Sequence, residues 1–130
     1  MAKPVTDTVK PTPVLARITL EDGSPIQSLI LDSPKPVKLD ASGSRDNVGV
    51  VSYTFKQNTS GNAGVDNYVD VDGCVNLTTP ICITTPTNTT GFNIGAGANA
   101  RTRTYYKVEV KDAAGNTALY AGNRYVDVKK

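Results

Sequence analysis

The sequence predicts an all-β chain, folded as an antiparallel β-sandwich of seven to nine short strands. Apolar and polar residues alternate with a period of two in one segment after another, which is typical of half-buried strands. No segment of useful length shows the 3.6-residue apolar period of an amphipathic helix. Gly, Pro, Asn and Asp end the alternating segments, and such frequent turns favour two packed sheets over a closed barrel or a repeat array.

The strands of the first half follow from this alternation. They are predicted at residues 14–20, 26–31, 37–39 and 50–56. One face of the first carries Val14, Ala16, Ile18 and Leu20, and the third points Val37 and Leu39 inward. The fourth places Val51, Tyr53 and Phe55 on one face, which makes it the best core strand of this half.

The second half continues the same pattern with a Thr-, Asn- and Gly-rich interval. Strands are predicted at residues 65–72, around Phe92 and Ile94, and at 101–111, 117–120 and 125–128. The first of these turns Val65, Asn67, Val69 and Val71 inward and leaves an acidic outer face. The strand at 101–111 is the clearest in the chain, with Thr102, Thr104, Tyr106, Val108 and Val110 on its inner face.

Residues 1–13 differ in composition from the rest and are predicted to form an extended arm that precedes a domain at 14–130. Prolines and alternating Thr, Val and Lys favour a polyproline-like segment over a packed element. Such an arm becomes ordered only against a partner, so we expect it to dock the chain onto an assembly. The residues expected to make that contact are Pro4, Val5, Val9, Pro11 and Pro13.

Composition excludes several classes of function. The 130 residues contain no histidine, which removes Ser-His-Asp and Cys-His catalysis and His-ligated zinc. A net charge of +2 spread along the chain is far from the strongly basic surface that nucleic-acid binding requires. The longest apolar run, Leu29 to Leu31, is too short for membrane insertion or for a signal peptide. We therefore expect a chain without an export signal that is not an enzyme.

Cys74 and Cys82 lie eight residues apart, with a Thr-Thr-Pro turn signal between them. Two cysteines that flank a turn can meet. Two interpretations stay open: a pair of small buried thiols, or a disulfide, which would imply folding or persistence outside a reducing cytosol.

Two stretches resemble polycystic-kidney-disease (PKD) domains and related bacterial immunoglobulin-like modules. Residues 37–55, VKLDASGSRDNVGVVSYTF, are similar to the B strand, B–C loop and C strand of a PKD domain, and residues 106–118, YKVEVKDAAGNTA, to its F strand and F–G turn. The resemblance implies an immunoglobulin-like sandwich. Where the PKD pattern has Trp-Asp-Phe-Gly-Asp-Gly, this chain has Thr54 to Asn58, so Phe55 must fill part of the volume of the missing tryptophan.

Four aspartates are candidate ligands for a divalent cation: Asp46, Asp112, Asp70 and Asp72. Asp70 and Asp72 share the outer face of the predicted strand 65–72 with Asp66, and the other two lie in loops. The favoured interpretation gives the aspartates structural roles. Those in loops cap backbone amides, and those on the strand form a solvated acidic face that discourages edge-to-edge pairing. We expect no cofactor, and calcium is the one ion that these residues could take.

Three tyrosines are predicted on the surface, Tyr68, Tyr105 and Tyr125. Their rings could stack on sugars or fill a protein interface. A basic stripe at Arg101, Arg103, Lys107 and Lys111 is interpreted as the charge alternation of a sheet.

The resemblance and the arm together lead to an expected role. Modules of this kind serve as spacers, adhesion modules and decorations on tailed-phage particles. We expect an accessory decoration protein on a virion surface, with a capsid or other virion protein as partner. The alternative is a spacer or glycan-adhesion module of a secreted bacterial protein, located extracellularly or at the cell surface with a cell-surface glycan as ligand. Fold alone does not decide between them.

Overall fold

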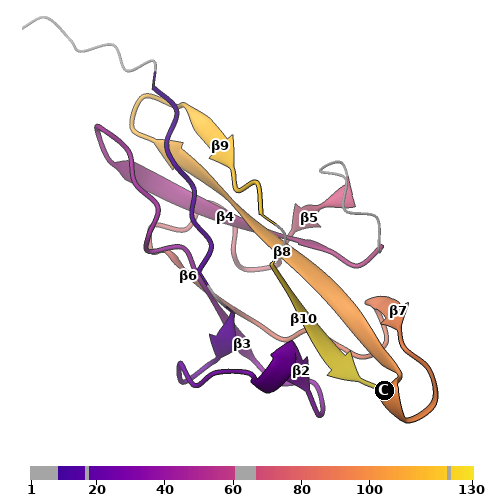
Figure 1. The fold of residues 1–130 in the computed structure, drawn as a ribbon. Helices are drawn as coiled ribbons and strands as arrows, with labels where there is room; N and C mark the ends of the chain where they lie inside the picture. Colours follow the sequence, from indigo (N-terminus) through magenta and orange to yellow (C-terminus); the bar gives the residue numbers. More distant parts are fainter. Residues whose placement is uncertain (1–8, 17, 61–66, 123) are drawn as a thin grey trace, which may run out of the picture.

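The computed structural model of the chain contains two β-sheets and, within its described residues, no α-helix (Figure 1). It describes residues 9–16, 18–60, 67–122 and 124–130. The strands are β1 (Thr19–Leu20), β2 (Ile30–Leu31), β3 (Val37–Asp40), β4 (Val50–Asn58), β5 (Val69–Asp70), β6 (Ile81–Thr84), β7 (Phe92–Ile94), β8 (Arg101–Asp112), β9 (Thr117–Leu119) and β10 (Arg124–Lys129). Two 3-10 turns, η1 (Gln27–Leu29) and η3 (Gly97–Asn99), precede β2 and β8.

The two sheets have three and seven strands. The smaller has the order β1-β3-β6, and the larger has the order β2-β10-β8-β4-β5, with β7 and β9 also paired to β8. All pairings are antiparallel except that of β2 with β10, which is parallel. The all-β prediction with two packed sheets is therefore confirmed.

Strand β8 organises the larger sheet. Its 12 residues pair with β10 and then β9 along one edge, and with β7 and then β4 along the other. The long strand runs the length of the molecule (Figure 1). At one end, residues 9–12, 41–51 and 111–116 lie together, and we call this end the N-terminal pole. The C-terminus lies at the opposite end.

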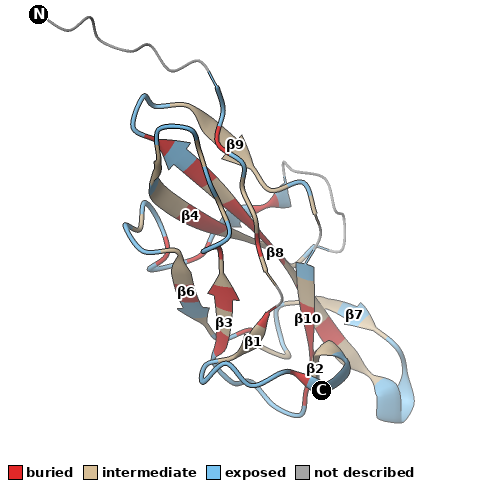
Figure 2. Cartoon of the chain, turned by 60° about the vertical axis from the view of Figure 1, so that its left-hand side comes forward, coloured by how far each residue is buried: buried red, intermediate tan, exposed pale blue. Residues whose placement is uncertain are grey.

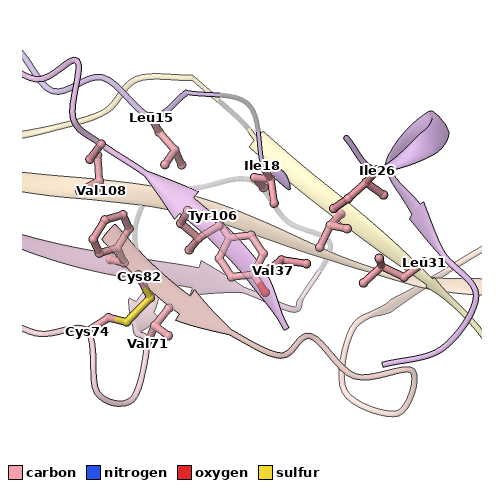
Figure 3. Packing of buried hydrophobic residues seen from close by; sticks show 14 of the residues in the cluster. Leu15, Ile18, Ile26, Leu31, Val37, Val71, Cys74, Cys82, Tyr106 and Val108 are labelled. Atoms are coloured by element: carbon pink, nitrogen blue, oxygen red, sulfur yellow. A yellow bond between two sulfur atoms is a disulfide. The ribbon is translucent and has the colours of Figure 1, made fainter. Parts of the chain in front are cut away.

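The core lies between the two sheets. The inner faces contribute Val37 and Leu39 from β3, Phe55 from β4, and Val108 from β8, all of them fully buried. Figure 2 shows buried residues along the length of β8, and Figure 3 shows side chains of the core packed between the layers. The predicted inner faces of the third strand and of residues 101–111 are confirmed, and Phe55 occupies the core as expected.

The edges depart from the predicted strands. The described residues form ten strands instead of seven to nine, because β6 was not predicted, and β1, β2 and β5 are only two residues long. Of residues 14–20 only Thr19 and Leu20 form a strand. Ile18 of the predicted Val14-to-Leu20 face enters the core, but Leu15 of the opposite face does so too, so the predicted alternation is wrong here. Residues 26–31 are interrupted because Ser28 and Leu29 adopt left-handed backbone angles, with φ of 55° and 59°.

Strand β4 carries an irregularity that the alternation did not predict. Its register against β8 shifts between Val50 and Ser52, as at a β-bulge. Val51 is exposed as a result, whereas Phe55 further along is fully buried and Tyr53 half-buried. Only part of the predicted inner face Val51-Tyr53-Phe55 therefore faces the core.

Cys74 and Cys82 form a disulfide, with a Cα–Cα distance of 5.8 Å. Cys82 lies on β6 of the smaller sheet, while the carbonyl of Cys74 accepts a hydrogen bond from the amide of Phe55 on β4, at 2.9 Å. The bond thus connects the two layers and lies against Val71 at one end of the core (Figure 3).

The hydroxyl of Tyr106 is an exception within this core. The residue is fully buried on the inner face of β8, and its hydroxyl has no hydrogen-bond partner among the described residues. Burial raises the pKa of Tyr106 well above its usual value. An unpartnered buried hydroxyl destabilises the folded state, because it gives up its bonds to water without replacing them.

Removing the disulfide tests its contribution. The double variant Cys74→Ala/Cys82→Ala should lower the free energy of unfolding by about 2 to 3 kcal/mol, because the closed loop is short. Urea unfolding of the oxidised protein and the variant measures the difference. A thiol titration of denatured protein that gives the same count before and after reduction would contradict the disulfide.

Replacing Tyr106 tests the unpartnered hydroxyl. Tyr106→Phe should raise the free energy of unfolding by about 1 kcal/mol at neutral pH. Because the folded-state pKa is raised, the unfolded chain ionises first in alkali, and wild-type stability falls as pH rises through about 10. The phenylalanine variant lacks this loss, so the gap between the two melting temperatures should widen from about pH 9 to about pH 11. A gap that stays constant contradicts the prediction.

Candidate functional site

The outer face of the larger sheet carries an unusual group of side chains. Even-numbered residues of β8 point into the core, so odd-numbered residues point away from it. On β10, Val126 and Val128 belong to the core, which places Tyr125 and Asp127 on the same outer face. Register brings this group together across three strands, and we call it the aromatic–arginine cluster: Phe92, Arg101, Arg103, Tyr105, Tyr125 and Asp127.

Asp127 is the centre of the cluster. Its side chain is only 2% exposed, although it lies on the outer face. Arg101 donates from Nε to Oδ2 at 2.6 Å, and Arg103 donates from Nε to Oδ1 at 2.7 Å and from Nη2 to Oδ2 at 3.1 Å. The bond to Asp127 raises the pKa of the Arg103 guanidinium. The two arginines thus pair with a buried carboxylate that would destabilise the folded state if it were left unpaired.

Aromatic rings surround this ion pair. The guanidinium carbon of Arg103 lies 3.9 Å from the centre of the Tyr125 ring, a cation–π contact. Tyr105 stacks on Phe92 with ring centres 5.7 Å apart and meets Tyr125 edge-on at 5.9 Å. Phe92 reaches this group because β7 pairs closely with β8. Just before it, a Cβ atom on Gly91 would lie 2.7 Å from the carbonyl oxygen of Arg103, so only glycine fits there.

Lys107 lies further along the same face and is buried as well. Its ammonium donates to the carbonyl oxygens of Tyr120 at 3.0 Å and Gly122 at 2.8 Å, and it lies 5.2 Å from the centre of the Tyr68 ring. Burial lowers the pKa of Lys107. The basic stripe predicted from the sequence is therefore not a row of solvated charges.

Sequence reasoning missed Asp127 for a definite reason. In β9, Lys111 pairs with Thr117 and Glu109 with Leu119. If that register continued, Arg103 would face Tyr125; in β10 it faces Asp127, two residues further along. The interruption between β9 and β10 adds the two residues. The Gly-Asn pair at 122–123 signalled a break, but nothing in the sequence specified its size.

The predicted surface tyrosines fall into two groups. Tyr105 and Tyr125 lie together in the cluster and are half-buried. Tyr68 was predicted to be exposed, which is wrong: it is buried, and this burial raises its pKa. The neighbouring Val69, predicted to face inward, is exposed instead, because β5 is an edge strand of only two residues and the alternation did not extend across it.

The four candidate aspartates do not form one site. Asp70, the last residue of β5, pairs with Lys56 at 2.7 Å. Asp72 follows two residues later and is exposed. Asp46 and Asp112 both lie at the N-terminal pole, where each accepts backbone amides of its own loop. Among the described residues, no three His, Cys, Asp or Glu side chains gather as a metal site would require. Asp66 lies outside the described residues.

Two of the five predicted docking residues, Pro4 and Val5, lie outside the described residues. The other three follow the surface of the N-terminal pole: Val9 is exposed, Pro11 is buried and Pro13 is half-buried. Residues 9–13 thus contact the domain that they were predicted only to precede.

A pocket of about 350 Å³ opens beside β6 and the threonine-rich segment that follows it. Its described lining includes one ionisable side chain, Asp72, with Gln57 and several threonines. A lone carboxylate offers no acid–base pair.

Comparison with known protein families and with curated protein sequences gives no match for this chain. No helix in the described part of the chain is long and apolar enough to span a membrane. The outer face combines guanidinium groups held by Asp127 with aromatic rings, and these residue types are enriched at protein interfaces.

Substituting the central carboxylate tests the cluster. Asp127→Asn should lower the free energy of unfolding by about 2 kcal/mol, because two arginines lose a buried charged acceptor. Asp70→Asn is the matched control, since it removes an exposed ion pair and should cost less than about 1 kcal/mol. Urea unfolding at neutral pH gives both values. Equal effects of the two substitutions would contradict a central role for Asp127.

Proposed function

We propose that this chain is a non-enzymatic structural and binding protein, an accessory decoration protein on the outside of a phage particle. In this proposal its N-terminal arm docks on the particle and an immunoglobulin-like domain is displayed.

The strand order supports the immunoglobulin-like assignment. Sheets ordered β1-β3-β6 and β2-β10-β8-β4-β5 correspond to the arrangement of A, B and E strands against G, F and C strands in such sandwiches. The stretches that resemble a PKD domain supply β3 and more than half of both β4 and β8.

The attachment of the N-terminal segment is the observation that carries the docking role. Thr12 donates to the carbonyl of Arg45 at 2.7 Å, and Arg45 donates back to Thr12 at 3.1 Å. The amide of Val14 donates to the Ser44 hydroxyl at 2.9 Å. The described part of the segment is therefore fixed to the domain at the N-terminal pole, which supports docking at this end of the molecule.

The disulfide is compatible with this location. A bond between Cys74 and Cys82 persists where thiols are not kept reduced, as on a released particle or a cell surface.

A spacer or glycan-adhesion module is the second candidate. The N-terminal pole and the C-terminus lie near opposite ends of the molecule (Figure 2), as in modules joined end to end. The half-buried rings of Tyr105, Tyr125 and Phe92 are the residues that would meet a sugar.

Two deletions test the docking arm. Removing residues 1–8 should leave the melting temperature almost unchanged, because it breaks none of the backbone pairs made by Thr12, and should abolish co-migration with particles on a density gradient. Removing residues 1–13 should also lower the melting temperature, since the pairing with Arg45 is lost. Mass spectrometry locates each chain in the gradient.

If the wild-type chain migrates in the gradient with envelope fragments, or is found as part of a longer polypeptide, the particle assignment is contradicted. Either result would favour the spacer or glycan-adhesion module. Co-migration that survives the deletion of residues 1–8 would contradict docking through the arm.

A further inference from the structure

The N-terminal pole exposes three valines from two of its segments. Val9, Val48 and Val51 are 55%, 52% and 46% exposed, among the most exposed large apolar residues of the described chain. The bulge in β4 is what turns Val51 outward. Beside them the turn after β8 exposes only small residues, Ala113, Ala114 and Gly115, which allow a partner to approach closely. Exposed apolar residues that gather on one surface are typical of an interface.

Among the described residues of the N-terminal pole, the fully exposed charged side chains are all positive. Lys10, Arg45 and Lys111 are exposed, and they come from the three segments that form the N-terminal pole. The carboxylates nearby are turned toward their own backbone: Asp40 accepts the amide of Ser42, and Asp46 accepts the amides of Val48 and Gly49. Asp112 is buried and accepts the amides of Ala114 and Asn116. The cations are therefore more exposed than the carboxylates, which are half-buried at Asp40 and Asp46 and buried at Asp112.

We infer that the N-terminal pole is a protein-docking surface whose partner is an acidic protein surface with an apolar centre. Opposite charge at the rim speeds association and sets orientation, while the valines supply the contact from which water is excluded. An anionic membrane is the weaker fit, because membrane-surface segments bury large side chains such as Trp, Phe and Leu, and the exposed apolar residues here are valines and alanines. The inference rests on the proposed function for placing this partner on a particle.

The test uses the purified full chain and a dye-labelled random copolymer of glutamate and tyrosine, followed by fluorescence anisotropy. Two variants change the pole: Val48→Ser/Val51→Ser and Lys10→Glu/Arg45→Glu. Their matched controls lie elsewhere: Val69→Ser/Val75→Ser changes two equally exposed valines, and Lys35→Glu/Lys130→Glu makes the same change of net charge toward the other end. Melting temperatures verify that every variant is folded.

Both pole variants should bind the copolymer about tenfold more weakly than wild type, and both controls within about twofold of it. Wild type that does not bind, or controls that lose as much affinity as the pole variants, would overturn the inference. Sedimentation with phosphatidylserine vesicles that depends on the pole residues would overturn it in favour of a membrane. None of these measurements uses the particle. A chain that does not migrate with particles would contradict the proposed function, whereas only the copolymer and vesicle experiments test the docking surface.

Discussion

Strand β8 constrains the whole molecule, because four other strands form hydrogen bonds with its two edges. One of its faces supplies Tyr106, Val108 and Val110 to the core between the sheets. The other face would be expected to carry solvated polar residues, since neither of the two sheets lies over it. Instead it collects Asp127 and Lys107, both buried. The same strand thus forms a large apolar core on one side and a small polar core on the other.

The small polar core depends on the break between β9 and β10. The segment that breaks away presents carbonyl oxygens to Lys107, and the two extra residues align Asp127 with Arg103. Both charged groups are hydrogen-bonded by several partners, which is the condition under which a buried charge is tolerated. Chemistry and topology are therefore linked here, because a continuous strand in place of β9 and β10 would abolish both contacts.

Sequence alone predicted those parts of the fold in which alternation runs over many residues. The inner face of β8 is the best case, since 12 consecutive residues follow one pattern. Strand β5 is the opposite case, because a two-residue edge strand has too few neighbours to determine which side Tyr68 faces. Within the candidate site, Tyr105 and Tyr125 could be named from the sequence. Their contact with the ion pair at Asp127 could not be predicted, because it depends on how many residues interrupt the pairing between β9 and β10.

The disulfide between Cys74 and Cys82 also has a mechanical consequence. A pull that separates the two ends of the molecule loads the parallel pairing of β2 with β10 in shear, so its hydrogen bonds resist together. Once those bonds fail, the chain lengthens segment by segment, yet the residues between the two cysteines cannot extend. The covalent bridge holds back about 20 Å of contour length. A domain standing on a surface in moving fluid would stretch less far and keep part of its two layers joined.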